Sequence, residues 1–243
     1  MNTFQIHVDT GSLFNIGGSN TSPVVSKTNS NPFQCSILLG NRHRALRNAR
    51  LTNAQIPLGF YNIRSPYNTL TITSTPYTVT PGWYTLASLT SALSSLTSLT
   101  WTANSNNTVT VALSSATLVV PTGISYPSLA QLLGFTNSQT LTGTIKSQNP
   151  AIVNFDTYLN IWIENIGQSS LEPSQITYKV PLNNVTNNVV YFNQNSNFSQ
   201  EVNVTDRNAR VDRLNITVLD RFGNIVDNNG LDWSFSLEVD ADN

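Results

Sequence analysis

Alternating apolar and polar residues are the dominant pattern of this chain, most clearly near its C-terminal end. In LDWSFSLEV (231–239), every second residue is apolar, and those between are Asp, Ser or Glu. A period of two places the apolar residues on one strand face, which packs on a core while the other face meets water. Further strands are expected at residues 4–8, 33–40, 151–155, 158–166, 176–180, 188–192, 198–204 and 213–220. Turns rich in Asn and Gly separate them, as in an antiparallel sandwich.

A different period marks residues 66–147, after a first strand NTLTI. Four leucines at spacings of three and four predict one apolar helix face: Leu86, Leu89, Leu93 and Leu96. Thr85 is the expected N-cap of this helix. A hairpin turning at Asn104–Asn107 should follow, and then a short helix with Pro127 in its first turn and Gly134 at its end. The order β-α-β-β-α predicts a compact unit inserted into a larger sheet protein.

Composition favours β structure and loops. Charged residues make up 10% of the chain, against a usual share of about a quarter, and Asn, Ser and Thr supply the polarity. The formal net charge of −1 gives no strong field toward nucleic acid or an acidic membrane. Cys35 is the only cysteine, so no intrachain disulfide forms and a reducing compartment is expected. Neither a signal peptide nor a membrane span of about 20 apolar residues is expected.

Charge is unevenly distributed along the chain. Asp9 is the only acidic residue before Asp156, whereas basic residues gather at positions 42–50, namely Arg42, His43, Arg44, Arg47 and Arg50. A basic N-terminal part and an acidic C-terminal part of the sequence suit head-to-tail contact between copies, although pairing within one chain would give the same pattern. The arginines could also face nucleic acid, but no stacking aromatics are interleaved with them. A solvated or subunit-facing basic edge is therefore favoured.

Asp9, Thr10 and Gly11 follow an apolar strand, which is how an aspartic protease presents a catalytic carboxylate. Such an enzyme needs two carboxylates that share one proton, and no second Asp-Thr-Gly or Asp-Ser-Gly occurs in the chain. An aspartic protease acting through Asp9-Thr10-Gly11 is therefore only a distant alternative. We expect instead that Asp9 ends a strand and caps a glycine turn.

No other enzyme chemistry is indicated. His7 and His43 are the only histidines, and the nucleophile elbow, the phosphate loop and zinc-ligand spacing are all missing from the sequence. Residues 220–232 are rich in oxygen ligands but do not match the calcium-loop pattern, and a hairpin with two turns explains them. The prediction is a protein that is not an enzyme, with no catalytic residue, no metal and no cofactor.

Four stretches, in this order, resemble the penton (minor capsid) proteins of virophages, Polinton-type elements and related large double-stranded DNA viruses. They are the opening motif NTFQIHVDTGS (2–12), the Ile-Pro motif LTNAQIPLGFYNI (51–63), the helix motif VTPGWYTLASLTSAL (79–93) and the terminal motif VLDRFGNIVDNNGLDWSFSLEV (218–239). LLGF (132–135) is similar to the segment that closes the family's inserted unit. The likeness spans nearly the whole chain. It places Asp9 where these capsid proteins carry a similar residue with no catalytic role.

The resemblance implies an all-β protein, a single jelly-roll antiparallel β-sandwich of two four-stranded sheets with the inserted β-α-β-β-α unit. The expected organisation is an N-terminal strand and extended arm (1–32) and a jelly-roll domain (33–243), which the inserted subdomain (66–147) interrupts. The implied function is a structural virion protein, the penton capsomer, made in the host cytoplasm and located at the capsid vertex. Its partners would be further copies of itself and the neighbouring major capsid protein, with no specific nucleic acid.

Five copies would close a ring through heterologous contacts at each icosahedral vertex. An arm strand exchanged onto a neighbour would also satisfy an exposed sheet edge. The residues expected at the subunit interface are Phe4, Ile6, Val8, Arg42, Arg44 and Arg47. A trimeric capsomer of the same fold stays open, because only mass or symmetry distinguishes it from the pentamer.

The rival hypothesis is a jelly-roll module for host attachment or carbohydrate binding. Sugar rings stack on aromatic faces, and the inserted unit offers four such residues for glycan contact: Trp83, Tyr84, Trp101 and Tyr126. Large aromatic side chains also dominate small cores, so packing within the unit is the simpler explanation.

Overall fold

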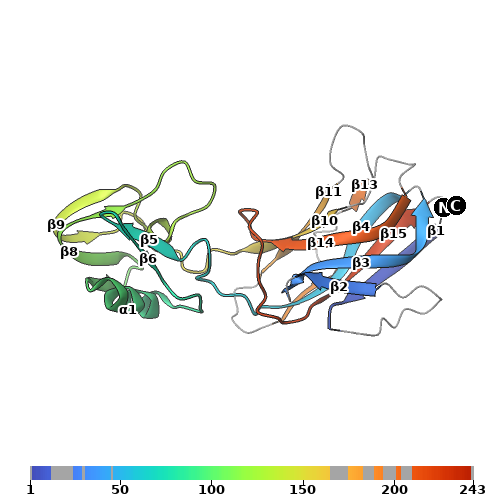
Figure 1. Ribbon diagram of the computed structural model, residues 1–243, viewed down its shortest axis with the longest axis horizontal. Helices are drawn as coiled ribbons and strands as arrows, with labels where there is room; N and C mark the ends of the chain where they lie inside the picture. Colours follow the sequence, from blue (N-terminus) through green and yellow to red (C-terminus); the bar gives the residue numbers. More distant parts are fainter. Residues whose placement is uncertain are drawn as a thin grey trace. The chain divides into compact units, whose positions relative to one another are not determined.

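The computed structural model describes residues 2–11, 24–28, 31–44, 46–164, 175–182, 189–193, 201–203 and 210–241. The chain divides into two compact units (Figure 1). The jelly-roll unit comprises Met1–Phe60 and Asp156–Asn243, and the insert comprises Tyr61–Phe155. No helix in the described part of the chain is long and apolar enough to cross a membrane.

The jelly-roll unit is built of antiparallel strands alone in its described residues. They are β1 (Asn2–Asp9), β2 (Val24–Thr28), β3 (Asn31–Arg44), β4 (Leu46–Pro57), β10 (Tyr158–Glu164), β11 (Gln175–Pro181), β12 (Val189–Asn193), β13 (Glu201–Asn203), β14 (Arg210–Leu219) and β15 (Ser234–Ala241). One sheet has the order β1-β15-β4-β12, with β13 also paired to β4. The other has the order β11-β10-β14-β3-β2, so each sheet has five described strands and the expectation of four strands in each was wrong.

This strand order is that of a single jelly roll. If β12 and β13 are taken as one position on β4, and β2 as an addition to β3, eight positions remain in chain order. One sheet then holds the first, eighth, third and sixth positions, and the other holds the second, seventh, fourth and fifth. That interleaving is the doubled Greek key of the jelly roll, so the predicted fold class is confirmed. The insert lies between β4 and β10 in the sequence.

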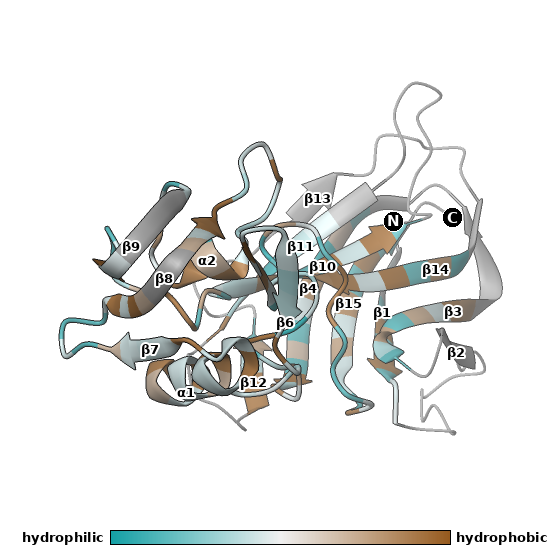
Figure 2. Ribbon diagram, turned by 60° about the vertical axis from the view of Figure 1, so that its left-hand side comes forward, coloured by the Kyte–Doolittle hydropathy of each residue, from teal (hydrophilic) through white to brown (hydrophobic). Residues whose placement is uncertain are grey.

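The core of the jelly-roll unit lies between its two sheets and follows the alternation seen in the sequence. Along β10, Leu159, Ile161 and Ile163 are fully buried, whereas the residues between them are partly exposed. Figure 2 shows the same alternation as bands of apolar and polar colour along β14 and β15. Each fully buried aliphatic side chain contributes about 1.5 to 3 kcal/mol of transfer free energy, which drives the sandwich together. Cys35 lies in this core, as its apolar strand predicts.

The insert is a small sheet with two helices. Its elements are β5 (Thr69–Ile72), β6 (Thr75–Thr78), α1 (Leu86–Thr97), β7 (Thr100–Ala103), β8 (Val109–Val119), α2 (Leu129–Leu132) and β9 (Gln139–Lys146). Its sheet has the order β6-β5-β8-β7, with β9 also paired to β8. The insert therefore contains two strands, β6 and β9, beyond the predicted order β-α-β-β-α. The sequence missed β6 because it is mostly exposed and shows no alternation of apolar and polar residues.

Both helices of the insert begin at hydroxyl caps. The Thr85 hydroxyl accepts a hydrogen bond from the Ser88 backbone N–H at 3.1 Å, and the Ser88 side chain completes the capping box, so the predicted cap is confirmed. Leu89 and Leu93 are fully buried, but Leu96 is 41% exposed and lies outside the buried face. In α2 the N-cap is Ser128, so the prediction that Pro127 lies within the first turn was wrong by two positions.

Gly134 ends α2, as predicted. Its φ of +91° lies in the region that favours glycine. A Cβ at this position would lie 2.0 Å from the Asn149 carbonyl oxygen, which leaves no space for any side chain.

Candidate functional site

The opening motif forms a turn around Asp9. The Gly11 N–H donates to the Asp9 carboxylate at 2.9 Å, and Asp9 itself is exposed at the end of β1. The prediction that Asp9 caps a glycine turn is therefore confirmed. In the described part of the chain, no three His, Cys, Asp or Glu side chains gather in a metal-binding group. The presence of Asp9 at this position is explained by its hydrogen bond within the turn.

Thr10 joins the opening motif to the terminal motif. The Thr10 N–H donates to the Trp233 carbonyl at 3.0 Å, and the Trp233 N–H donates to the Thr10 hydroxyl at 2.9 Å. The same hydroxyl lies 3.1 Å from an Asp232 carboxylate oxygen. Trp233 in turn donates its indole N–H to the Pro32 carbonyl at 2.7 Å and packs edge-on against Phe33. A buried threonine thus fixes the first strand to the last.

Asn228 joins the Ile-Pro motif to the terminal motif. This fully buried side chain accepts a hydrogen bond from the Gly59 N–H at 2.9 Å and donates one to the Leu231 carbonyl at 3.0 Å. Asn229 adds a hydrogen bond to the Gly59 carbonyl at 2.6 Å. A Cβ at Gly59 would lie 2.7 Å from the Asn228 carbonyl oxygen, so this close approach requires glycine.

The terminal motif contains two successive turns, as the sequence predicts. The first is closed by a hydrogen bond from the Gly223 N–H to the Asp220 carbonyl at 3.1 Å. The second is closed from Leu231 to Asn228 at 3.0 Å, with φ of +51° at Asn229 and +77° at Gly230. Positive φ at both central residues is typical of the type I′ turn, which Asn-Gly favours. The oxygen-rich composition of 220–232 is explained by these turns.

Asn62 joins the Ile-Pro motif to the helix motif inside the insert. Its amide accepts from the Tyr84 N–H at 2.9 Å and donates to the Tyr84 carbonyl at 2.8 Å. The same amide donates to Asn154 at 2.9 Å, so the first and last segments of the insert are bound together. Arg64 strengthens this closure, because its guanidinium lies 5.3 Å and 5.5 Å from the ring centres of Tyr67 and Phe155.

Sequence reasoning named Asn62 only as part of the Tyr-Asn-Ile step in the Ile-Pro motif, with no structural role, and it did not single out Asn228. Asn is abundant in this chain, and most of its asparagines are expected in turns. The only sequence feature that could have indicated their importance is their position, since both lie inside motifs that carry the likeness to the penton family.

The structure places two predicted interface residues in the core of their own chain. Ile6 and Val8 are 6% and 2% exposed, opposite Leu237 and Phe235 of β15. Phe4 lies opposite Val239 in the same ladder, and its side chain is outside the described part. An exchanged β1 would make these same contacts with a neighbouring copy. The assignment of these residues to a subunit interface stays a prediction.

The predicted basic residues lie on adjoining strands. Arg42 and Arg44 belong to β3, where Arg44 lies opposite Arg210, and Arg47 belongs to β4. Their side chains are outside the described part of the chain. Their role in subunit contact stays a prediction.

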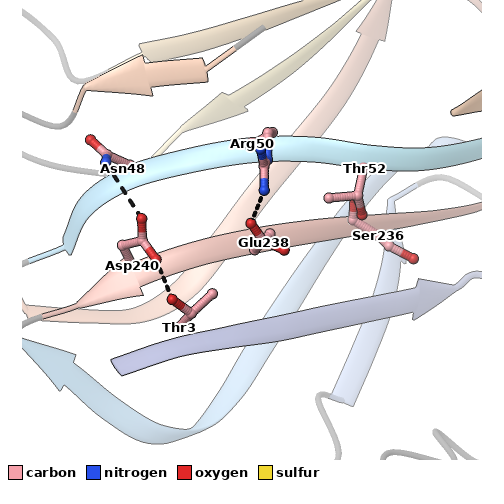
Figure 3. A network of polar contacts seen from close by, with 7 residues as sticks. All are labelled: Thr3, Asn48, Arg50, Thr52, Ser236, Glu238 and Asp240. Atoms are coloured by element: carbon pink, nitrogen blue, oxygen red, sulfur yellow. Dashed lines mark hydrogen bonds and ion pairs between the residues drawn. The ribbon is translucent and has the colours of Figure 1, made fainter. Parts of the chain in front are cut away.

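The solvent-facing side of β1, β15 and β4 carries a polar network (Figure 3). Asp240 accepts hydrogen bonds from Thr3 at 2.6 Å and from Asn48 at 3.4 Å, and Arg50 forms an ion pair with Glu238. This ion pair joins the basic N-terminal part of the sequence to its acidic C-terminal part within one chain. At this position, the uneven charge distribution reflects intramolecular pairing.

The four aromatic residues of the glycan hypothesis make separate contacts within the insert. Trp101 is 5% exposed, donates its indole N–H to Thr97 at 3.0 Å and packs edge-on against Phe135. The rings of Tyr126 and Tyr67 also meet edge to face. Tyr84 donates its hydroxyl hydrogen bond to the Thr80 carbonyl, and Trp83 is partly exposed. Trp101 is a core residue, and glycan contact by the others stays a prediction.

The strand order and the insertion define the class of protein, a single jelly roll interrupted between β4 and β10. No protein-family model matches the chain, and no curated protein matches it in sequence. Among solved structures, the chain is similar to the crystal structure of the selenomethionine-labelled mavirus penton protein. The TM-score is 0.48 and the sequence identity is 8%, over 100% of both chains.

Proposed function

We propose that this protein is a structural component of a virion, the penton capsomer, which forms the icosahedral vertices by assembling with itself into a homopentamer. In this role it binds the neighbouring major capsid protein around its rim. Its place is the capsid vertex, and its synthesis takes place in the host cytoplasm. It acts through its surfaces and catalyses no reaction.

One observation carries this proposal: the four motifs that resemble the penton family are hydrogen-bonded to one another across long stretches of the sequence. Thr10 of the opening motif and Gly59 of the Ile-Pro motif both bond to the terminal motif. Asn62 of the Ile-Pro motif bonds to Tyr84 of the helix motif. A chance likeness would have no reason to fall on residues that contact one another across 22 to more than 200 positions of sequence.

A jelly roll suits assembly because its sheets leave free edges and exposed loop ends around a rigid core. In a ring of five, each copy gives one surface and receives a different one, so the contact is heterologous and closes by rotation. The insert leaves the sandwich intact, since β4 and β10 keep their places in the two sheets.

Electron microscopy of the purified protein tests the proposal. We expect class averages with five-fold symmetry and, in purified virus particles, density for this chain at the five-fold vertices. Three-fold averages would support the trimeric capsomer instead. Single particles with no symmetry, together with glycan binding that is lost in Trp83→Ala while the fold is kept, would support the attachment module.

A further inference from the structure

The second turn of the terminal motif contains the one Asn-Gly pair of the sequence, Asn229-Gly230. Both residues are exposed, and both have positive φ, +51° and +77°. A Cβ at Gly230 would meet no atom within 4 Å, so no neighbouring group crowds the main chain at this position. The peptide group between the two residues is therefore accessible to water.

The backbone nitrogen that follows Asn229 is not held by a hydrogen bond. In the described part of the chain, the Gly230 N–H has no acceptor, and the turn is closed instead by the next N–H, that of Leu231. Glycine also has no side chain that would shield this nitrogen from the neighbouring asparagine. The Gly230 nitrogen is thus available as a nucleophile.

Asn107 in the insert shows which of these features are unusual. It is also exposed and also has positive φ, +60°. The residue after it, however, is Thr108, which is 7% exposed and donates its N–H to the Asn106 side chain at 3.4 Å. The two turns therefore share exposure and backbone conformation, and they differ in the nitrogen that follows the asparagine.

A free backbone nitrogen beside an asparagine side chain can displace the side-chain amide. Hydroxide first takes the proton of the Gly230 nitrogen, which then attacks Cγ of Asn229, so that an N–Cγ bond forms and the Cγ–Nδ2 bond breaks. Nδ2 takes a proton from water, which restores the hydroxide, and leaves as ammonia. One water molecule opens the resulting succinimide ring to aspartate or isoaspartate. The sum is one water consumed and one ammonia released, with no oxidation or reduction.

The amide that would be lost is one of the bonds between the Ile-Pro motif and the terminal motif. Asn229 Nδ2 donates to the Gly59 carbonyl at 2.6 Å. An ionised aspartate has no proton to donate, so two acceptors would face each other there. Isoaspartate in addition lengthens the main chain by one carbon inside the turn that the Leu231 N–H closes on the Asn228 carbonyl. We infer that Asn229 is a site of spontaneous deamidation, and that this modification breaks its link to Gly59.

Peptide mapping of the aged protein tests the modification. The folded protein is incubated at neutral pH and at one pH unit higher, and mass spectrometry measures the conversion of each asparagine. We expect conversion at Asn229 and none above background at Asn107, with a rate at Asn229 about tenfold higher at the higher pH, because the nucleophile is the deprotonated nitrogen. Asn229→Gln should remove the mass gain from the peptide that contains Asn224 and Asn228. An unconverted Asn229, or equal conversion at Asn229 and Asn107, would overturn the inference.

The structural consequence is tested with Asn229→Asp. The matched control is Asn107→Asp, which places the same charge in an exposed turn where, among the described residues, the asparagine side chain makes no hydrogen bond. Hydrogen exchange is measured at the amides of Gly59 and Leu231. We expect both to exchange roughly 2- to 10-fold faster in Asn229→Asp, the factor that corresponds to one lost hydrogen bond, and to be unchanged in Asn107→Asp. Equal exchange in the two variants would contradict the loss of the link to Gly59.

Discussion

The jelly-roll unit and the insert reach stability by different means. The insert contains only two charged residues, Arg64 and Lys146, whereas all 13 acidic residues of the chain lie in the jelly-roll unit. The jelly roll hides one apolar core between two sheets and covers its outer face with polar pairs such as Arg50–Glu238. The insert packs a single small sheet against short helices and aromatic rings, with amides and hydroxyls as its polar groups.

Both units nevertheless use the same hydrogen-bond arrangement at their joints, by which we mean buried polar side chains that link segments distant in the sequence. In the jelly roll, the Thr10 hydroxyl accepts a hydrogen bond from the Trp233 N–H at 2.9 Å and donates one to the Trp233 carbonyl at 3.1 Å. In the insert, Asn62 does so with both backbone groups of Tyr84. A buried uncharged side chain that satisfies an N–H and a C=O at once avoids the cost of desolvating a charge. These two joints therefore depend on hydrogen-bond geometry and close packing.

The largest effect is expected for Gly134→Ala in the insert. The added methyl group would lie 2.0 Å from the Asn149 carbonyl oxygen, so the backbone must move. We expect the free energy of unfolding of the insert to fall by about 3 to 5 kcal/mol, with the jelly-roll unit unaffected. Hydrogen exchange in denaturant, read separately for peptides of each unit, measures this difference.

Gly123→Ala is the matched control for backbone conformation. Gly123 also has positive φ, +76°, but a Cβ there meets no atom within 4 Å. Only the left-handed strain of about 1 to 2 kcal/mol should remain. Equal losses for the two variants would show that the contact at Asn149 contributes nothing.

A smaller effect, confined to the jelly roll, is expected for Thr10→Val. The change keeps the shape of the side chain but leaves the buried Trp233 N–H without its acceptor, which costs about 1 to 3 kcal/mol. Thr3→Val makes the same change at an exposed position within β1, the strand that Thr10 directly follows, where about 0.5 kcal/mol or less is expected. Chemical denaturation measures both. Similar values for the two would contradict the role of Thr10 as a joint.

The smallest effect at neutral pH is expected for Tyr178→Phe in the jelly-roll core. The buried Tyr178 hydroxyl has no hydrogen-bond partner among the described residues. Removing it should leave the free energy of unfolding unchanged or raise it by up to about 1 kcal/mol. A loss of more than about 1 kcal/mol would contradict a Tyr178 hydroxyl without a hydrogen-bond partner.

The same variant gives a sharp pH test. Burial raises the pKa of Tyr178 above its ordinary value of 10.0. Above pH 10 the unfolded chain releases this proton while the folded chain keeps it, so the stability of the unmodified protein falls as pH rises. Tyr178→Phe should show a shallower fall above pH 10 and the same pH dependence below it. Parallel curves across this range would contradict the burial of a neutral Tyr178.

Much of the fold could be predicted because strands and helices have periods that a sequence displays. The alternation at 231–239 gives β15, and the leucine spacing with Thr85 gives α1. The pairing of strands has no comparable local signal. Residues 188–192 and 198–204 were predicted as two strands, and both β12 and β13 pair with β4. Which strand lies beside which depends on the path of the whole chain.

The joints were predictable only in part, for a related reason. Asp9 was identified because an Asp two residues before a Gly has a local turn as its partner. Thr10 and Asn228 bond to residues 223 and 169 positions away, and no local pattern records such a partner. The resemblance to the penton family marked the segments, and the structure shows which side chains join them.

The mass of the protein in solution tests most directly whether the chain assembles with further copies of itself. Light scattering coupled to size exclusion, run over a range of protein concentrations, measures it without labels or variants. We predict a species of five times the 26.6 kDa of one chain. A mass of one chain at every concentration would contradict self-assembly.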